Sequence, residues 1–270
     1  MTWWEAIVLG LVEGLTEYLP VSSTGHLVLA QRALGIPEGE AANAYAICIQ
    51  AGAILAVLGL YRGRVVQVCR GFTGGDAEGR RLGLCLLTAF LPAAAVGLLL
   101  DERIEELLFG LKPIVAAWMV GGLAILVVAR WRRGREQAPE GIELARLGLQ
   151  GALMIGLAQC LALWPGTSRS LVTIVGGLLV GLSMAAAVEF SFLLGVLTLL
   201  AATAYKALGD GPVLLENYGW GTMLIGTLSA WLFAVVSVRW MVRWLQSHGL
   251  ELFGWYRVLL ALAVGAWIYA

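Results

Sequence analysis

The sequence predicts an all-α polytopic membrane protein built as an inverted-topology repeat, with six spanning helices and two re-entrant helix-loop-helix hairpins. Its 270 residues are 60% hydrophobic and 13% charged, with a mean hydropathy of +0.83. A soluble domain is typically about 45–50% apolar and about 25% charged. Apolar segments of about 20 residues, enough to cross the hydrocarbon core, recur along the chain. Two further apolar regions are interrupted by proline, glycine and polar residues.

The six spans are expected in two sets of three, and an interrupted region, about 5–36 or 147–184, precedes each set. Lipid does not tolerate exposed irregular backbone, so the interruptions must be buried in protein or line a wet cavity. Re-entrant hairpins meet that requirement. The expected spans are residues 43–61, 82–100, 111–129, 186–205, 219–238 and 252–270.

The two interrupted regions resemble one another. Residues 10–13 (GLVE) align with 156–159 (GLAQ), and residues 18–25 align with 164–170 after a one-residue slip. Because three spans follow each region, the second copy must enter the membrane from the opposite side, as in inverted-repeat proteins. The sequence thus predicts a single integral-membrane domain, with a first repeat over 1–135 and an inverted second repeat over 136–270.

Basic residues are concentrated in alternate connections. Few lie near the N-terminus or after the second and fourth spans, namely Arg32, Arg103, Lys112 and Lys206. By the positive-inside rule, both termini are expected outside the cytoplasm. The net charge is zero, which gives no indication of a nucleic-acid partner. The residues on the basic side are Arg62, Arg64, Arg70, Arg80, Arg81, Arg130, Arg132, Arg133, Arg135, Arg146, Arg239, Arg243 and Arg257.

Residues 12–26 (VEGLTEYLPVSSTGH) concentrate ionisable groups at membrane depth, where such groups are costly and usually functional. Glu13 and Glu17 are four residues apart and share one helix face. Paired carboxylates suit a divalent cation, Mg²⁺ or Ca²⁺, or a general base. A structural pair that shares a proton is the alternative. Gly10 and Gly14 would allow another helix to approach closely.

The hydroxyl-rich turn that follows Pro20 can present backbone N–H groups to an anion. A hydroxyl near an imidazole can also act as an activated nucleophile, which makes Ser23 and His26 candidate catalytic groups. Capping of the next helix is the alternative role for any one hydroxyl. The candidate anion ligands in this turn are Ser22, Ser23, Thr24 and Gly25.

The second interrupted region places Arg169 among hydroxyls. The planar guanidinium suits bidentate recognition of a phosphate group, and snorkelling to the interface is the alternative. Glu189 is either a site residue or a salt-bridge partner inside the bundle, and Gln50 is expected to line the same cavity. Further candidate ligands beside Arg169 are Thr167, Ser168 and Ser170.

Residues 13–26 and 163–170 (LWPGTSRS) resemble the two signature motifs of the bacterial undecaprenyl-pyrophosphate phosphatase family, also called the bacitracin-resistance protein family. The likeness runs the whole length and includes residues 189–194 (EFSFLL). One departure is Leu171, where the second motif usually has glycine, and it removes no candidate ligand. The resemblance implies hydrolysis of undecaprenyl pyrophosphate to undecaprenyl phosphate and inorganic phosphate, which recycles the lipid carrier for the cell wall.

The resemblance also implies a multi-pass protein of the bacterial cytoplasmic membrane, a divalent cation, an active site facing the periplasm or exterior, and bacitracin resistance on overproduction. Its partners would be a polyprenyl pyrophosphate lipid and the bilayer, with a homodimer as one option. The positions that match the family's functional residues are Glu13, Glu17, Ser23, His26 and Arg169.

Phosphoryl transfer mainly requires positioning and charge neutralisation. The mechanism expected here uses Ser23 or a water as nucleophile, His26 as base or leaving-group acid, and Arg169 to stabilise the phosphoryl oxygens. Direct attack by His26 is a further option. The competing interpretation is a secondary transporter or a lipid-phosphate flippase, in which Glu13 and Glu17 would couple ions.

Overall fold

The computed structural model describes residues 1–37, 39–108, 110–133 and 141–269. Within these ranges six helical segments are long and apolar enough to cross a membrane, which confirms the predicted all-α polytopic class. All six overlap the predicted spans. They are Ala41–Leu60, Ala77–Leu100, Leu111–Arg132, Met184–Gly209, Glu216–Ser247 and Glu251–Ile268.

Helix α9 contains two of these spans, and its backbone departs from helical geometry at Gly219, where φ is 72°. The helices of the first half are α1 (Trp3–Thr16), α2 (Ser23–Ala33), α3 (Glu40–Leu60), α4 (Arg62–Phe72), α5 (Ala77–Leu108) and α6 (Leu111–Arg133). The second half contains α7 (Leu149–Gln159), α8 (Arg169–Leu179), α9 (Met184–Ser247) and α10 (Glu251–Tyr269), with short 3₁₀ turns η1 (Leu144–Arg146) and η2 (Cys160–Leu163).

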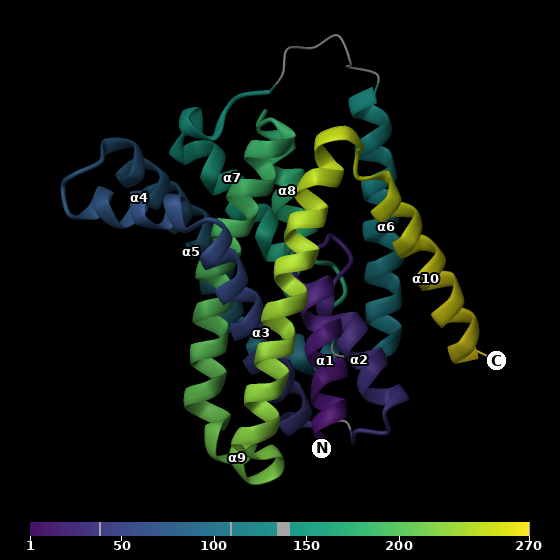
Figure 1. The fold of residues 1–270 in the computed structure, drawn as a ribbon. Coiled ribbons are helices and arrows are strands. Elements are labelled where there is room, and N and C mark those ends of the chain that lie inside the picture. The colour runs from purple at the N-terminus through teal and green to yellow at the C-terminus, as the bar shows by residue number, and fades with distance from the viewer. Residues whose placement is uncertain (38, 109, 134–140, 270) are drawn as a thin grey trace.

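The sequence predicts only a connection over residues 62–81, whereas the structure has helix α4 there. With the start of α5 it forms an arm that projects from the bundle (Figure 1). Glycines allow this tight pairing: a Cβ on Gly71 would lie 2.1 Å from the backbone nitrogen of Arg80, and one on Gly79 would lie 1.9 Å from the carbonyl oxygen of Gln67. Backbone contact between the two helices therefore stabilises an arm whose side chains are mostly polar.

The two interrupted regions form helix-turn-helix hairpins in opposite halves of the bundle. The pair α1–α2 occupies the lower half of Figure 1, and α7–α8 occupies the upper half. Both hairpins turn at a serine with left-handed backbone, Ser22 with a φ of 73° and Ser168 with a φ of 77°. In the described part of the chain these are the non-glycine residues with positive φ. The shared geometry supports the prediction of an inverted repeat.

Each hairpin packs on a span from the other half. A Cβ on Gly10 of α1 would lie 2.3 Å from the carbonyl oxygen of Gly226 in α9, and one on Gly156 of α7 would lie 2.5 Å from the carbonyl oxygen of Ala89 in α5. These distances allow no side chain at either glycine, as predicted for close helix contact. The halves are therefore interleaved, with each hairpin against the second span of the opposite half.

Arginines gather at one end of the molecule. Helix α4, the end of α6 and the turn from α9 to α10 all lie at the top of Figure 1, whereas the N-terminus and the α9 turn at Gly219 lie at the bottom. Arg62 and Arg70 of α4 and Arg130 of α6 are thus at one end, which we call the arginine-rich end. This grouping agrees with the alternation of basic connections in the sequence.

Candidate active site

The two hairpin turns are joined by hydrogen bonds from serine hydroxyls to one carbonyl. The Ser170 hydroxyl donates to the Leu19 carbonyl oxygen at 2.9 Å, and the Ser168 hydroxyl donates to the same oxygen at 3.5 Å. Ser168 also caps α8, because its hydroxyl accepts from the Leu171 N–H at 3.3 Å. The two turns therefore meet at the points where their segments leave helical geometry, and this brings their polar side chains together.

Glu17 links the two hairpins at this meeting point. Its Oε1 pairs with Nη2 of Arg169 at 3.0 Å, and its Oε2 accepts from the Ser23 hydroxyl at 2.5 Å. The side chains of Arg169 and Glu17 are only 10% and 5% exposed. An acid, an alcohol and a guanidinium from two distant segments thus form one buried cluster, as the sequence predicted.

The Arg169 guanidinium has space because residue 195 is a glycine. A Cβ there would lie 2.2 Å from Nη1 of Arg169. Nη1 donates to the Ser191 carbonyl oxygen at 3.0 Å, while Nε is buried without a hydrogen-bond partner. The guanidinium therefore has one buried donor available for a ligand.

This cluster lies at the polar end of a cleft of about 510 Å³. Apolar walls come from α3, α5, η2 and α9, and the cleft reaches the surface where Leu98 and Tyr205 are 70% and 57% exposed. The polar lining residues are Glu17, Ser22, Ser23, Thr24, Gln50, Gln159, Ser168, Arg169, Thr198, Tyr205 and Lys206. Predicted site residues in this lining are Glu17, Ser22, Ser23, Thr24, Gln50, Ser168 and Arg169.

Other predicted ligands lie outside this lining. Gly25 faces α6, where a Cβ would lie 2.3 Å from the Trp118 ring. Ser170 is fully buried and bonded to the first hairpin. Thr167 belongs to the turn itself, its N–H donating to the Trp164 carbonyl at 3.1 Å. These three residues shape the turns, and the cleft is lined by their neighbours.

Glu13 is completely buried on α1, one helical turn before Glu17. Neither of its carboxylate oxygens has a hydrogen-bond partner. A buried carboxylate without partners is costly, so it requires either a proton or a cation. Among the residues described, no group of three or more His, Cys, Asp or Glu side chains could hold a metal. Two protein carboxylates still fit Mg²⁺, which commonly binds through one or two carboxylates plus substrate phosphates and water.

His26 faces away from the cleft, toward α6 and α10. Its ring stacks on Tyr256 with centroids 5.7 Å apart and lies 5.4 Å from the Trp118 ring. Nδ1 is 2.7 Å from the Ser22 carbonyl oxygen, and Nε2 is 2.7 Å from the Tyr256 hydroxyl. Since a carbonyl only accepts, Nδ1 carries a proton and Nε2 is the nitrogen with a lone pair in the neutral ring. The structure does not bring His26 to the Ser23 hydroxyl.

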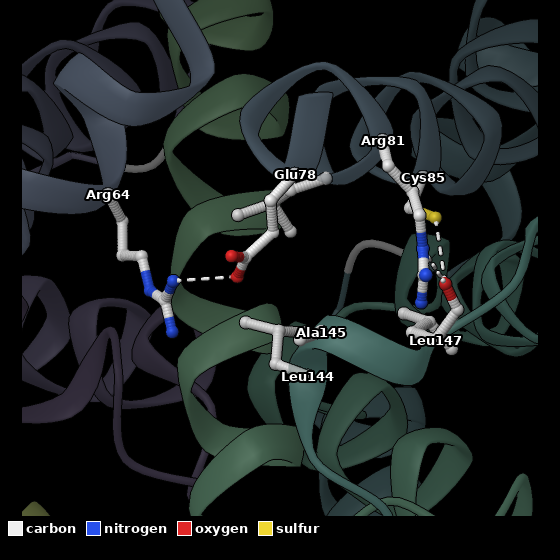
Figure 2. Close-up of a pocket in the computed structure, with 8 residues that line it drawn as sticks. Arg64, Glu78, Arg81, Cys85, Leu144, Ala145 and Leu147 are labelled. Carbon is white, nitrogen blue, oxygen red and sulfur yellow. Dashed lines mark hydrogen bonds and ion pairs between the residues drawn. The ribbon is translucent and has the colours of Figure 1, made fainter. Parts of the chain in front are cut away.

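Glu189 is a salt-bridge partner at the arginine-rich end, one of its two predicted roles. Its Oε1 is 2.7 Å from Nε of Arg64, and this hydrogen bond raises the pKa of the Arg64 guanidinium. Arg64 also forms an ion pair with Glu78 at 3.3 Å. Figure 2 shows a small pocket beside this pair, in which the Leu147 carbonyl oxygen accepts a hydrogen bond from Arg81. This pocket is about 10 Å³, room for about one water, so it cannot take a pyrophosphate.

Sequence analysis missed several residues of the cluster. Gln159 lines the cleft, accepts from the Thr198 hydroxyl at 3.2 Å and donates to the Ala89 carbonyl at 3.4 Å. Its alignment with Glu13 between the two repeats was the available signal. Ser191 and Gly195, which contact Arg169, lie in an apolar span and carried no such signal.

This chain is similar to known proteins along nearly its whole length. Residues 6–263 match the family model described as bacitracin resistance protein BacA. An undecaprenyl-diphosphatase of Sorangium cellulosum is 46% identical over 98% of this chain and 86% of its own length. Undecaprenyl-diphosphatase 2 of Rhodospirillum rubrum is 44% identical over 96% of this chain and 93% of its own, and undecaprenyl-diphosphatase 1 of Chromobacterium violaceum is 42% identical over 97% and 95%.

Proposed function

The chain belongs to the bacitracin resistance protein BacA family, and we propose that it is an integral-membrane phosphatase that hydrolyses undecaprenyl pyrophosphate to undecaprenyl phosphate and inorganic phosphate. Relatives more than 40% identical carry the name undecaprenyl-diphosphatase. This reaction recycles a lipid carrier for the cell wall, so overproduction is expected to confer bacitracin resistance.

One observation carries the proposal: Glu17 holds the Ser23 hydroxyl and the Arg169 guanidinium at one end of a cleft whose walls are mainly apolar. Phosphoryl transfer needs a positioned nucleophile and positive charge on the phosphoryl oxygens. Ser23 supplies the first and Arg169 the second. The apolar walls suit the polyprenyl chain of the substrate, and the opening beside Leu98 would let that chain remain in lipid.

The short contact between Ser23 and Glu17 favours Ser23 as the nucleophile. In this mechanism Ser23 Oγ attacks the terminal phosphorus, and Glu17 accepts the hydroxyl proton. The bond to the bridging oxygen breaks and releases undecaprenyl phosphate. Water then hydrolyses the phosphoserine and releases inorganic phosphate. A water in place of Ser23 would use the same base and the same guanidinium.

Glu17 rather than His26 is the base in this proposal, because Glu17 already accepts from the Ser23 hydroxyl. His26 keeps the role of leaving-group acid. For this role His26 must be the imidazolium, with one proton on Nδ1, which faces the Ser22 carbonyl, and a second on Nε2. The ring must leave Tyr256 and turn toward the cleft before Nε2 can give its proton to the leaving phosphate.

Glu13 and Glu17 are the residues that would hold a divalent cation, with Mg²⁺ favoured by the low number of protein ligands. The cation would neutralise charge on the pyrophosphate. The partnerless oxygens of Glu13 support this assignment. Glu17 would then face the cation and Arg169 together.

We further propose that the protein lies in the bacterial cytoplasmic membrane with its arginine-rich end in the cytoplasm. The positive-inside rule supports this orientation. Both termini would then lie outside the cytoplasm, and the cleft, which extends to Tyr205 and Lys206 near the α9 turn, would face the periplasm or exterior. The homodimer stays a prediction.

A phosphate-release assay tests this function. Purified protein in detergent should release inorganic phosphate from undecaprenyl pyrophosphate, stop when chelator is added, and resume with excess Mg²⁺. The same inverted hairpins occur in transporters, so proteoliposomes should be assayed in parallel for movement of the lipid phosphate. Lipid movement without phosphate release by the purified protein would replace the phosphatase with the flippase alternative.

A further inference from the structure

Arg257 is a fully buried arginine in α10, outside the catalytic cluster. From the sequence it counts among the residues of the basic side. A charged side chain at membrane depth is costly and usually has a specific function. The described structure gives Arg257 no carboxylate partner, since all of its hydrogen bonds go to backbone carbonyl oxygens.

These carbonyls belong to three separate segments. Nη1 donates to Pro20 of the first hairpin turn at 3.3 Å. Nη2 donates to Gly166 of the second turn at 2.8 Å and to Ala117 of α6 at 2.8 Å, and Nε donates to Trp118 of α6 at 3.4 Å. One planar guanidinium therefore connects both turns to one rigid helix.

The physical need for this contact lies in the turns. Where the chain leaves the helix, carbonyl oxygens lose their intrahelical donors, and an unsatisfied carbonyl is costly within a bilayer. Pro20 comes two residues before Ser22, and Gly166 two residues before Ser168. Arg257 thus satisfies equivalent positions in the two hairpins, immediately before the residues that line the cleft.

The space for this guanidinium is provided by a glycine on α6. A Cβ on Gly121 would lie 2.3 Å from Nη2 of Arg257 and 2.8 Å from Cζ. On neighbouring Gly122, a Cβ would meet Val258 at 2.9 Å, the Gly254 carbonyl at 3.0 Å and the Cβ of Arg257 at 3.1 Å, which is the start of that side chain and not its guanidinium. The two glycines face the same helix, but only Gly121 faces the guanidinium.

We propose that Arg257 is a positioning residue for the reaction: it fixes the two re-entrant turns relative to each other, and so sets the geometry in which Ser23, Glu17 and Arg169 meet the pyrophosphate. The catalytic part of this inference rests on the proposed phosphatase function. A misplacement of about 1 Å at a reacting group can cost about 100-fold in rate. Loss of Arg257 should therefore lower kcat while KM changes little.

The test compares Arg257→Lys, Gly121→Ala and the matched control Gly122→Ala. Lysine keeps the charge but loses the planar fork. We expect kcat per folded molecule to fall about 100-fold in R257K and G121A, and to stay within about threefold in G122A, which perturbs the same helix interface. Equal losses in G121A and G122A, or wild-type kcat in R257K, would overturn the inference and leave the phosphatase function standing.

A second measurement does not depend on activity. Hydrogen exchange by mass spectrometry should show faster exchange of backbone amides in both turns, residues 21–25 and 166–169, in R257K and G121A but not in G122A. Protection equal to wild type in both turns of R257K and G121A would contradict the positioning role even if the wild type released no phosphate. A wild type without phosphate release would instead contradict the proposed function.

Discussion

The Ser23 hydroxyl donates a hydrogen bond to the Glu17 carboxylate at 2.5 Å across the turn of the first hairpin. The two residues are six apart in sequence and belong to different helices, α1 ending just before Glu17 and α2 beginning at Ser23. The left-handed backbone of Ser22 reverses the chain between them. An alcohol and a carboxylate are thereby placed in contact.

This contact predicts that Glu17→Gln and Ser23→Ala both lose catalysis. General-base catalysis contributes about 10²- to 10⁴-fold, and we expect losses of kcat in that range for each variant. Because one step uses both groups, the double variant should be hardly slower than either single variant. Initial rates of phosphate release provide the measurement, and additive losses would separate the roles of the two residues.

The two ring nitrogens of His26 can be tested separately. An asparagine amide can replace Nδ1 as the donor to the Ser22 carbonyl, but it has no group at the Nε2 position. If Nε2 delivers a proton to the leaving group, His26→Asn should lose as much activity as His26→Ala. We expect kcat of both variants to fall about 100-fold or more below wild type. Near wild-type turnover of H26N would show instead that His26 acts only through the Ser22 carbonyl.

A side chain at position 195 should impair catalysis, although Gly195 itself has no functional group. A Cβ there would lie 2.2–2.5 Å from the Arg169 guanidinium, whose flexible end can move aside. Gly195→Ala should therefore fold normally but weaken the pair with Glu17, lowering kcat/KM about 10- to 100-fold. Gly59→Ala is the matched control, because a Cβ at Gly59 meets nothing within 4 Å. Equal kcat/KM in Gly195→Ala and Gly59→Ala would contradict this prediction.

Glu13 should govern the affinity for the cation. Glu13→Gln removes one negative charge and one metal ligand, so we expect the Mg²⁺ concentration for half-maximal phosphate release to rise at least tenfold. Saturating Mg²⁺ should restore part of the activity. Titration of chelator-treated protein with Mg²⁺ checks this, and an unchanged midpoint would mean that Glu13 is neutral and shares a proton instead.

The membrane orientation can be tested with a native thiol. Cys69 of α4 is exposed at the arginine-rich end, whereas Cys48 and Cys85 are buried. The experiment uses the Cys160→Ser variant, which lacks the one partly buried thiol and so leaves Cys69 as the exposed one. In intact cells a membrane-impermeant maleimide should leave Cys69 unlabelled, and a permeant maleimide should label it. A cysteine at Thr2, beside the N-terminus, should react with the impermeant reagent. The reverse pattern would place the arginine-rich end outside.

The sequence was most informative where residue type determines structure directly. Length and hydropathy are properties of single segments, so the spans and both hairpins could be located. The cluster of Glu17, Ser23 and Arg169 was foreseen because polar groups interrupting apolar runs must meet inside the protein. Gln50 was predicted to line the cavity because its position is related to that of Glu189, and it does lie in the cleft, whereas Glu189 does not line it.

Side-chain direction could not be obtained in this way. His26 and Ser23 lie on one helix only three residues apart, yet the left-handed Ser22 and the Trp118 ring of α6 turn the imidazole toward Tyr256. Arg257 appeared as a basic residue near a membrane surface, although carbonyls from three segments surround it. Both outcomes depend on contacts between segments far apart in the chain.

The interleaving of the halves has a consequence for biogenesis. The hydroxyls of Ser229 and Ser237 donate to carbonyls of α1 that lie 222 residues earlier in the chain. At about 5–20 residues per second, the ribosome needs roughly 10–45 s to synthesise that distance. During this interval the nascent N-terminal hairpin has no permanent neighbour for its glycine face. This face is therefore covered only after most of the chain has been synthesised, so separately translated halves should be stable only when both are made in the same cell.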